Sequence, residues 1–244
     1  MENEIDVYGL GLQRDTFITL MSQRKSGKSV LISNLIHYFL TADESNRCHY
    51  CYLFSTTAKL NQTTNHSFSF LDPRAILEPR PEIINPFVQN LIQSQKKTKM
   101  KYHILLVFDD IVVTKRYEAL EFLATAGRHY SITVILSSQI SNNAISPIIR
   151  SNVDYIFWRK LGKLALQNNI FPYMSISDFQ DYNQLHQFTL ENTSDYRFVF
   201  YDNSTDSVDQ KIKLVRARDL PPDFRYQLAD MSHRSSKPKR FVQW

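Results

Sequence analysis

The sequence predicts an α/β fold with a central, mainly parallel sheet flanked by helices. Runs of β-branched and aromatic residues alternate with runs of helical periodicity, and that alternation is typical of a parallel sheet. The most apolar run, Ile104–Phe108, has no polar position, as is typical of a central strand that helices cover on both faces. A segment rich in serine, glycine and lysine, 22–29, separates the first expected strand from the first expected helix.

The expected strands are short runs rich in β-branched and aromatic residues. Those that alternate with helices are Asp15–Leu20, His49–Ser55, Ile104–Phe108, Ile132–Leu136 and Val153–Trp158. Two later runs, Tyr196–Tyr201 and Lys211–Val215, are separated by the polar segment Asp202–Asp206 and suggest a hairpin.

Helical periodicity predicts the segments between the strands. The first helix contains Val30–Leu40, which is apolar on most faces and should be packed inside. Further helices are expected over Pro81–Gln95 and Glu118–Ala126, and another over Ser177–Gln187 with a cap at Ser177 or Asp178.

The bulk composition is ordinary for a soluble globular protein. The 244 residues, 43% hydrophobic and 22% charged, are enough for one large core. No linker divides the chain, so we expect a single domain over 1–230 and a basic, flexible tail over 231–244. The net charge of +5 fits either simple solubility or a polyanionic partner such as DNA or RNA.

Cysteine usage and hydropathy restrict the compartment. Cys48 and Cys51 are too few for a secreted disulfide scaffold, and their C-x-x-C spacing lacks the second pair of a structural zinc site. We therefore expect two thiols in a strand. No apolar run approaches the ~18 residues of a membrane span. Met1–Asp6 is acidic, unlike a secretory signal, so we expect a reducing compartment and no membrane.

Residues 22–29 read Ser-Gln-Arg-Lys-Ser-Gly-Lys-Ser, close to the Walker A or P-loop pattern G-x-x-x-x-G-K-[ST]. In this pattern backbone N–H groups surround the phosphates of a nucleotide such as ATP. Gly27 allows the tight turn, Lys28 brings an ammonium to the terminal phosphates, and Ser29 offers a hydroxyl to Mg²⁺. The candidate nucleotide-binding residues are Ser22, Gln23, Arg24, Lys25, Ser26, Gly27, Lys28 and Ser29.

The context of the pattern favours a P-loop nucleoside-triphosphatase over a chance match. An expected strand precedes the loop, and an apolar helix follows it and points its positive N-terminal end at the same anion. One position departs from the pattern, because Ser22 stands where the first glycine belongs. Serine is small but disfavours positive φ, so this position matches the usual loop geometry less well, while the P-loop assignment stands.

Two carboxylates end the most apolar strand. A P-loop protein needs a second strand, Walker B, that brings a carboxylate to the metal, and Asp109 is the candidate for binding Mg²⁺ directly or through water. Asp110 follows, so alternation along the strand turns it to the other side, where it could polarise the attacking water as a general base. The alternative is that two acids merely cap a strand end.

Three further residues join Lys28 and Asp110 as candidates for catalysis. Gln139 ends the next strand, where a neutral amide can sense the γ-phosphate or orient water, unless it only closes the strand. Arg128 and Arg150 are candidate arginine fingers acting from a neighbouring subunit, unless they are surface or ion-paired arginines.

Four segments together carry a resemblance to a known family. They are SQRKSGKS at 22–29, ILLVFDDI at 104–111, GRHYSITVILSSQ at 127–139 and PIIRSNVDYIFW at 147–158. The chain resembles the genome-packaging ATPases of the FtsK/HerA superfamily, in the form found in poxviruses, other large DNA viruses and virophages, and it looks most like the virophage type. The resemblance spans roughly Phe17 to Trp158.

This resemblance implies a RecA-like fold of the ASCE type that pumps double-stranded DNA into a preformed capsid at the expense of ATP. It also implies a homo-oligomeric ring in which a neighbour completes each active site, a capsid or its vertex as partner, and work in the host cytoplasm, at the viral factory or with the virion. Carried over, Lys28 and Ser29 bind nucleotide and metal, Asp109 binds Mg²⁺, Asp110 is the catalytic acid and Gln139 is the sensor. The wider superfamily often has glutamate at the position of Asp110.

Two basic runs without acidic residues suit the phosphate backbone of DNA, with contacts that are sensitive to salt and independent of sequence. The alternative is a solvated loop and a disordered tail. The runs are Ser94–Lys101, with Lys96, Lys97, Lys99 and Lys101, and His233–Arg240, with Arg234, Lys237, Lys239 and Arg240.

Two rival functions remain open from the sequence. A small-molecule phosphotransferase, such as a nucleoside or nucleotide kinase, would share the P-loop and the sheet. A non-enzymatic DNA-binding or assembly factor would keep a vestigial nucleotide site, and Ser22 alone points that way. A GTPase is disfavoured because the sequence has no N-K-x-D segment.

Overall fold

The computed structural model describes residues 5–60, 67–111, 118–138, 146–174, 178–205 and 207–228. Within them, every strand belongs to one eight-stranded sheet with the order β3-β2-β4-β5-β1-β6-β7-β8. The strands are β1 (Phe17–Ser22), β2 (Tyr50–Phe54), β3 (Ile76–Leu77), β4 (Ile104–Phe108), β5 (Ile132–Ser138), β6 (Tyr155–Arg159), β7 (Arg197–Asp202) and β8 (Ile212–Arg216).

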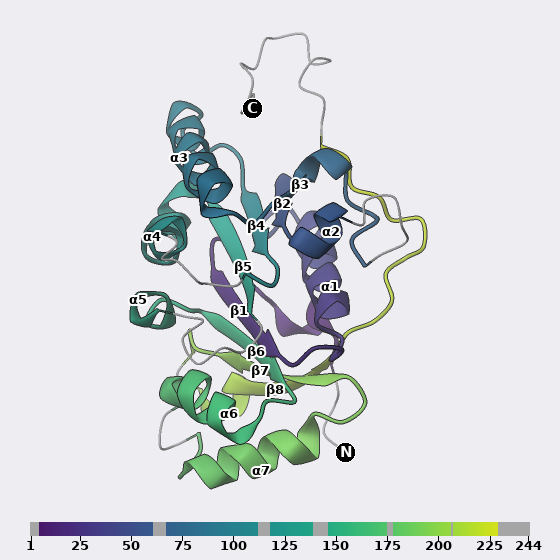
Figure 1. Cartoon of the computed structure of the whole chain (residues 1–244), viewed down its shortest axis with the longest axis vertical. Coiled ribbons are helices and arrows are strands. Elements are labelled where there is room, and N and C mark those ends of the chain that lie inside the picture. The colour runs from purple at the N-terminus through teal and green to yellow at the C-terminus, as the bar shows by residue number, and fades with distance from the viewer. Residues whose placement is uncertain are drawn as a thin grey trace.

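Helices connect the strands and cover the sheet (Figure 1). The α-helices are α1 (Lys28–Thr41), α2 (Thr56–Leu60), α3 (Pro81–Lys97), α4 (Glu118–Ala126), α5 (Pro147–Arg150), α6 (Lys163–Asn169), α7 (Tyr182–Asn192) and α8 (Val208–Lys211). Single 3₁₀ turns are η1 (Val7–Leu10), η2 (Pro73–Ala75), η3 (Gly127–Tyr130) and η4 (Phe171–Tyr173).

The sheet is parallel through its first six strands and antiparallel at one edge. β1 pairs in parallel with β5 and β6, and β4 pairs in parallel with β2 and β5. β7 pairs antiparallel with β6 and with β8, so the predicted hairpin is present. β5 lies between β1, which precedes the phosphate-loop segment, and β4, which precedes the acidic pair. The predicted α/β fold with a mainly parallel central sheet is confirmed.

Alternation along the central strands sends side chains to two cores, one on each face of the sheet. Ile104, Leu106 and Phe108 of β4 belong to the core under α3, α4 and α5. Leu105 and Val107 belong to the core under α1. Figure 1 shows the same division, with α1 on one side of the sheet and α3, α4 and α5 on the other. Both faces of β4 are buried, which is why its sequence has no polar position.

The predicted helix over Ser177–Gln187 is misplaced, because α7 begins at Tyr182. Its N-cap is Asp181, whose carboxylate accepts a hydrogen bond from the Gln184 backbone N–H at 2.9 Å. Asp178 lies four residues before the first residue of α7 and accepts the Tyr201 hydroxyl at 2.9 Å instead, and Ser177 lies outside the described residues. A carboxylate just before a helical pattern is typical of an N-cap, but Asp178 and Asp181 are close together in the sequence. Tertiary contacts decide which of the two caps the helix.

After β8 the chain crosses α1 as an extended strap, residues 217–228 (Figure 1). The Asn34 side chain on α1 holds the strap in both directions, donating to the Arg218 carbonyl at 2.7 Å and accepting the Arg218 N–H at 2.9 Å. Further along, Tyr226 pairs with Leu71 in a parallel bridge beyond β3. The strap joins the chain's last described segment to the same core, whereas the predicted tail over 231–244 lies outside the described residues.

Both cysteines are buried free thiols, Cys51 inside β2 and Cys48 just before it. Burial raises the pKa of Cys48 to about 12 and that of Cys51 well above its usual value, so both stay protonated at neutral pH. Across the described ranges, no three histidine, cysteine or acidic side chains are grouped to hold a metal ion. In the same part of the chain, no helix combines the length and apolarity needed to cross a membrane.

Candidate active site

The predicted P-loop residues and the two predicted carboxylates lie at the edge of the sheet where the parallel strands end. β1 runs into the loop 22–29, β4 runs into Asp109 and Asp110, and β6 ends at Arg159. Because β1, β4, β5 and β6 are mutually parallel, their carboxyl ends lie on one side of the sheet. This is the side on which ligands bind in open α/β sheets.

The loop 22–29 has the backbone that close approach of an anion requires. Gly27 is the N-cap of α1 with φ +86°, and Lys25 also has positive φ, +57°. A Cβ at Gly27 would lie 3.0 Å from Cδ1 of Tyr196, so both the backbone conformation and the packing demand glycine. Left-handed residues at alternate positions of such a turn let successive backbone N–H groups face a common point, which suits phosphate.

Ser22 departs from the Walker A pattern without straining the loop. It is the last residue of β1 and does not have positive φ, so the preference of serine against that conformation costs nothing here. It is fully buried, and its Oγ accepts a hydrogen bond from the Ser26 hydroxyl at 2.7 Å. The serine therefore ties the beginning of the loop to a position four residues later.

Lys28 and Asp110 form an ion pair at the mouth of the loop. Lys28 is only 6% exposed, although it begins the first turn of α1. Asp110 has φ +53°, so it has left the extended strand, and the argument from strand alternation does not apply to it. Asp109 and Asp110 do contact different partners, but the cause is the left-handed backbone at Asp110 and not strand alternation.

Asp109 is buried between hydroxyls from the strands on either side of β4. Its Oδ2 accepts from Ser55, which follows β2, and its Oδ1 accepts from Ser137 of β5, both at 3.2 Å. Burial chiefly, and then the charge of Asp110, raise the pKa of Asp109 above its usual value, while Lys28 and the two hydroxyls act in the opposite direction. The two hydroxyls thus orient the Asp109 carboxylate, but its contacts do not fully offset the cost of burying its negative charge.

Solved structures with this arrangement include viral packaging ATPases. The DNA-packaging ATPase B204 from Sulfolobus Turreted Icosahedral Virus matches 85% of this chain and 100% of its own, with TM-score 0.54 and 19% identity. The genome packaging NTPase B204 of Sulfolobus turreted icosahedral virus 2, in complex with ATP-γS, matches 83% of this chain and 98% of its own, with TM-score 0.56 and 18% identity.

A third similar structure is the pCW3 conjugation coupling protein TcpA with ATPγS, at TM-score 0.57 and 12% identity, covering 84% of this chain and 60% of its own. No protein-family model matches the sequence. No curated protein sequence matches it either.

The chain has the fold of a P-loop ATPase. Its structural neighbours include a viral DNA-packaging ATPase and a conjugation coupling protein. At these identities the likeness shows the fold alone. In this sheet, β5 separates the P-loop strand β1 from the acid-bearing strand β4.

The donor set of this P-loop ATPase fold fits Mg²⁺. The cation prefers hard oxygen ligands and usually keeps several waters, with one or two carboxylates and substrate phosphates. Ser29, in the first turn of α1, and Asp109 are oxygen donors of this kind. The raised pKa of Asp109 fits a carboxylate that lacks the positive charge it is built to face.

Arg159 belongs to the site, although the sequence analysis did not select it. It is opposite Ser22 in the β1–β6 register, is 2% exposed, and its Nη1 donates to the Ser26 carbonyl at 2.5 Å. Burial lowers the pKa of Arg159, but a guanidinium stays charged in proteins. A charged residue directly after the apolar run Tyr155–Trp158 was the available signal.

The remaining candidates lie away from the P-loop. Arg128 is exposed in η3, just before β5. Burial raises the pKa of Asp154, just before β6, and the charge of Arg128 acts in the opposite direction. Arg150 ends α5 and acts electrostatically on Tyr173. Arg128 precedes β5 and Arg150 precedes β6, so both lie on the side of the sheet where the parallel strands begin. From that side neither arginine reaches the P-loop of its own chain. Gln139 falls outside the described residues.

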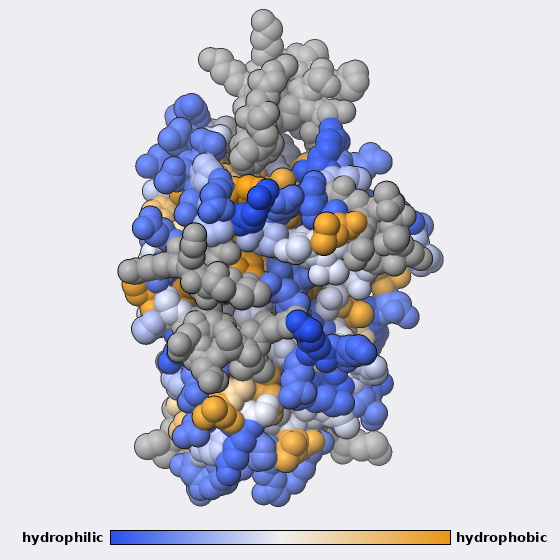
Figure 2. Space-filling model, viewed as in Figure 1, coloured by the Kyte–Doolittle hydropathy of each residue, from blue (hydrophilic) through white to orange (hydrophobic). Residues whose placement is uncertain are grey.

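The basic run Ser94–Lys101 lies at the opposite edge of the sheet from the P-loop. It spans the end of α3 and the turn before β4, where Lys99 and Met100 have positive φ. Lys96 lies 5.6 Å over the ring of Tyr130, and Lys101 lies 5.5 Å over that of Tyr102. The surface around α3 is mostly hydrophilic (Figure 2).

Proposed function

We propose that this chain is an ATP-driven translocase of double-stranded DNA that packages a viral genome into a preformed capsid. One observation carries the ATPase part: Lys28, Asp109 and Asp110, from segments about 80 residues apart in the sequence, meet at the carboxyl edge of an ASCE-type sheet. A phosphate-binding lysine beside two carboxylates is the combination that NTP hydrolysis needs.

Each residue then has a distinct task. The loop 22–29 binds the phosphates through its N–H groups and Lys28, while Ser29 and Asp109 hold Mg²⁺, which neutralises charge that develops on the phosphates. Asp110 accepts a proton from the attacking water. Its ion pair with Lys28 must open when phosphate arrives, because the phosphate and the carboxylate compete for the same ammonium.

A homo-oligomeric ring follows from the arginines. Phosphoryl transfer is accelerated by a guanidinium that enters from outside the site, and Arg128 or Arg150 of one subunit would serve the P-loop of the next. Their distance from their own P-loop supports action in trans. The ring would surround DNA, contact a capsid vertex, and work in the host cytoplasm or with the virion.

The DNA-pump proposal is tested by translocation itself. A third strand bound at one end of a long duplex is displaced by a protein that moves along the duplex, and its release is measured by fluorescence. We expect release that requires ATP, Mg²⁺ and the full-length chain, and none with Lys28→Ala. ATP hydrolysis without strand release, under conditions in which the protein assembles, would contradict translocation and leave an ATPase of another kind.

A further inference from the structure

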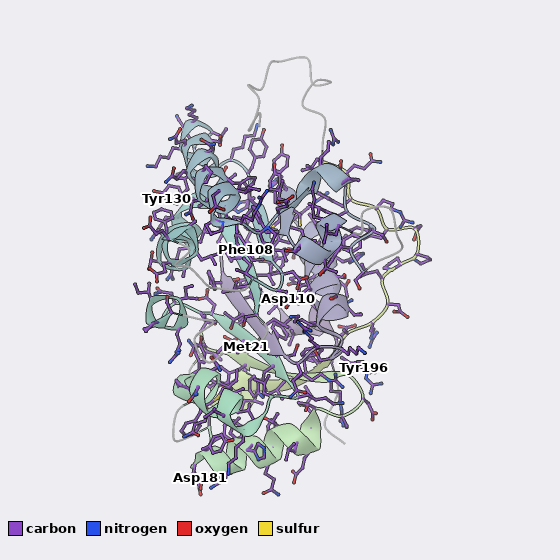
Figure 3. All side chains as sticks on the ribbon, in the orientation of Figure 1. Met21, Phe108, Asp110, Tyr130, Asp181 and Tyr196 are labelled. Atoms are coloured by element: carbon purple, nitrogen blue, oxygen red, sulfur yellow. The ribbon has the colours of Figure 1, made fainter. Side chains whose placement is uncertain are left out.

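Tyr196 rests on the P-loop from the side away from the acidic pair. Its Cδ1 sets the 3.0 Å limit that keeps position 27 a glycine. The guanidinium carbon of Arg159 lies 4.7 Å from the Tyr196 ring centroid, yet the residue remains 59% exposed. Figure 3 shows Asp110 near the centre of the molecule and Tyr196 at its right-hand side, below α1. The ring of Tyr196 thus contacts Arg159 and the phosphate loop on one side and is exposed on another.

The backbone holds this ring at a cost. Asp195 and Tyr196 have φ of +47° and +60°, and neither is glycine. Consecutive left-handed non-glycine residues each cost roughly 1 kcal/mol, and such strain clusters at functional sites. The connection is short and fixed after Ser194, whose carbonyl and hydroxyl accept from Arg197 at 3.0 and 2.6 Å. Tyr196 is therefore positioned by the loop, at the beginning of β7.

The face of α1 next to Tyr196 has room for a ligand. Gly27, Val30 and Asn34 lie on one face of the helix, at spacings of three and four residues. Beside Val30, which is 36% exposed, a groove of about 570 Å³ separates α1 from the strap. Arg218, Asp219 and Leu220 form its far wall, and the Asn34–Arg218 hydrogen bonds hold that wall in place.

When the loop holds the phosphates of a nucleotide, the nucleoside can extend from the loop in two directions. Toward β4 it meets Asp109 and Asp110, whose charges suit a metal and terminal phosphates but not an apolar ring. Toward β6 and β7 it meets the ring of Tyr196 at Gly27, and further along the same face of α1 it meets Val30 beside the strap, so one surface is aromatic and the other aliphatic. A nucleobase is a flat π-system that is stabilised by stacking on an aromatic ring.

We propose that Tyr196 is the platform on which the base of the bound nucleotide stacks, with Val30 and the groove beside the strap accepting the rest of the nucleoside. This subsite rests on the proposed ATPase function and adds its ligand class, purine nucleoside triphosphates. Stacking tolerates any base but favours the larger purine surface, so ATP and GTP bind more tightly than CTP and UTP.

The experiment compares ATP with inorganic tripolyphosphate, which has the phosphates but no nucleoside. Binding of each, with Mg²⁺, is measured by calorimetry for the wild type, Tyr196→Ala, Tyr196→Phe and Tyr8→Ala. Tyr8 is the matched control, because it is an exposed tyrosine (43%) that packs against the far end of α1 through His37. Thermal unfolding of each variant reports whether the fold is kept.

Tyr196→Ala should weaken ATP about ten-fold and leave tripolyphosphate unchanged, because the loss of one stacked base is of this order. Tyr196→Phe and Tyr8→Ala should bind both ligands like the wild type. Equal weakening of both ligands would overturn the base platform and make Tyr196 a support for Gly27. Lys28-dependent ATP binding that Tyr196→Ala leaves intact would overturn this subsite alone, whereas a wild type that binds neither ligand would overturn the ATPase function as well.

Discussion

The parallel strands end at one edge of the central sheet, the carboxyl edge, and begin at the opposite one, the amino edge. Charged side chains of the candidate active site are buried at the carboxyl edge, whereas those of the basic run are exposed at the amino edge. At the carboxyl edge Lys28, Asp109 and Arg159 are each at most 6% exposed, and each contacts a particular partner. At the amino edge Lys96 and Lys101 are exposed and lie over tyrosine rings. Buried charges are costly and are kept where chemistry requires them, whereas exposed charges act through long-range attraction that salt screens. The difference suggests that nucleotide chemistry and polyanion binding occupy separate edges.

The strongest test of the comparison removes the buried ammonium. Lys28→Ala should lower ATP hydrolysis about 1,000-fold or more, because a fixed cation at the transferred phosphate is lost. Circular dichroism should show an intact fold. Lys163→Ala is the control, since Lys163 also begins a helix, α6, but is exposed and lies outside the loop 22–29. Equal activity of wild type and Lys28→Ala would remove the P-loop from the mechanism.

The next largest effect should come from the neighbouring carboxylate. Asp110→Asn keeps the shape of the side chain but cannot accept a proton, so hydrolysis should fall about 100-fold or more. ATP affinity should stay the same or increase, because Lys28 loses a competing partner. Single-turnover hydrolysis and calorimetry separate the two quantities. Loss of binding with unchanged turnover of bound ATP would make Asp110 a binding residue and not the base.

Substitution of Arg159 tests whether this residue supports the phosphate loop or contributes to recognition of the base. Arg159→Met removes the hydrogen bond to the Ser26 carbonyl and should weaken ATP and tripolyphosphate alike, about ten-fold. Arg14→Met is the control, because that partly buried arginine donates to a backbone carbonyl away from the loop, that of Glu44, at 2.9 Å. A loss for ATP alone would mean that Arg159 acts through Tyr196 and the base, which would merge two roles that we separate.

The amino edge should respond to salt, not to nucleotide. Lys96→Gln combined with Lys101→Gln should reduce the slope of log affinity for DNA against log salt by about 2, at roughly 0.9 per phosphate contact. Lys163→Gln combined with Lys213→Gln is the control pair; Lys163 also lies over a tyrosine ring, at 5.7 Å from that of Tyr182. Identical salt slopes for both pairs would contradict a DNA role for this edge.

The smallest effect concerns stability. Because the pKa of Asp109 is raised in the fold, the folded chain binds that proton more strongly than the unfolded chain. The stabilising contribution is therefore present below the ordinary value of 3.8 and is lost as pH rises through the raised value. At pH 7, Asp109→Asn should raise the Tm of the nucleotide-free protein, by about 2–4 °C for each kcal/mol recovered.

Asp72 provides the opposite sign for comparison. Hydrogen bonds from Arg74 lower the pKa of Asp72, so its ionised form stabilises the fold above pH 3.8. Asp72→Asn should therefore lower the Tm at pH 7. A lower Tm for Asp109→Asn as well would mean that Asp109 is a structural carboxylate.

Local patterns were enough to predict most of the carboxyl edge. β4 and α4 have the predicted bounds, and the loop 22–29 follows β1 as expected, because a buried strand and a phosphate loop have distinctive local sequences. The charge of Arg159 directly after an apolar run was a local signal, but neither its contact with the P-loop nor the place of Tyr196 could be found in this way. The two residues come together only because β6 and β7 extend the sheet beyond β1, a tertiary arrangement that no local pattern encodes.

The central claim is that the buried charges of the carboxyl edge hydrolyse ATP in response to DNA. Its most direct test is steady-state ATP hydrolysis by the full chain with Mg²⁺, with and without long double-stranded DNA, across a salt series. We predict hydrolysis that DNA stimulates, that weakens as salt rises, and that Lys28→Ala abolishes. Hydrolysis that is indifferent to both DNA and Lys28 would contradict the account.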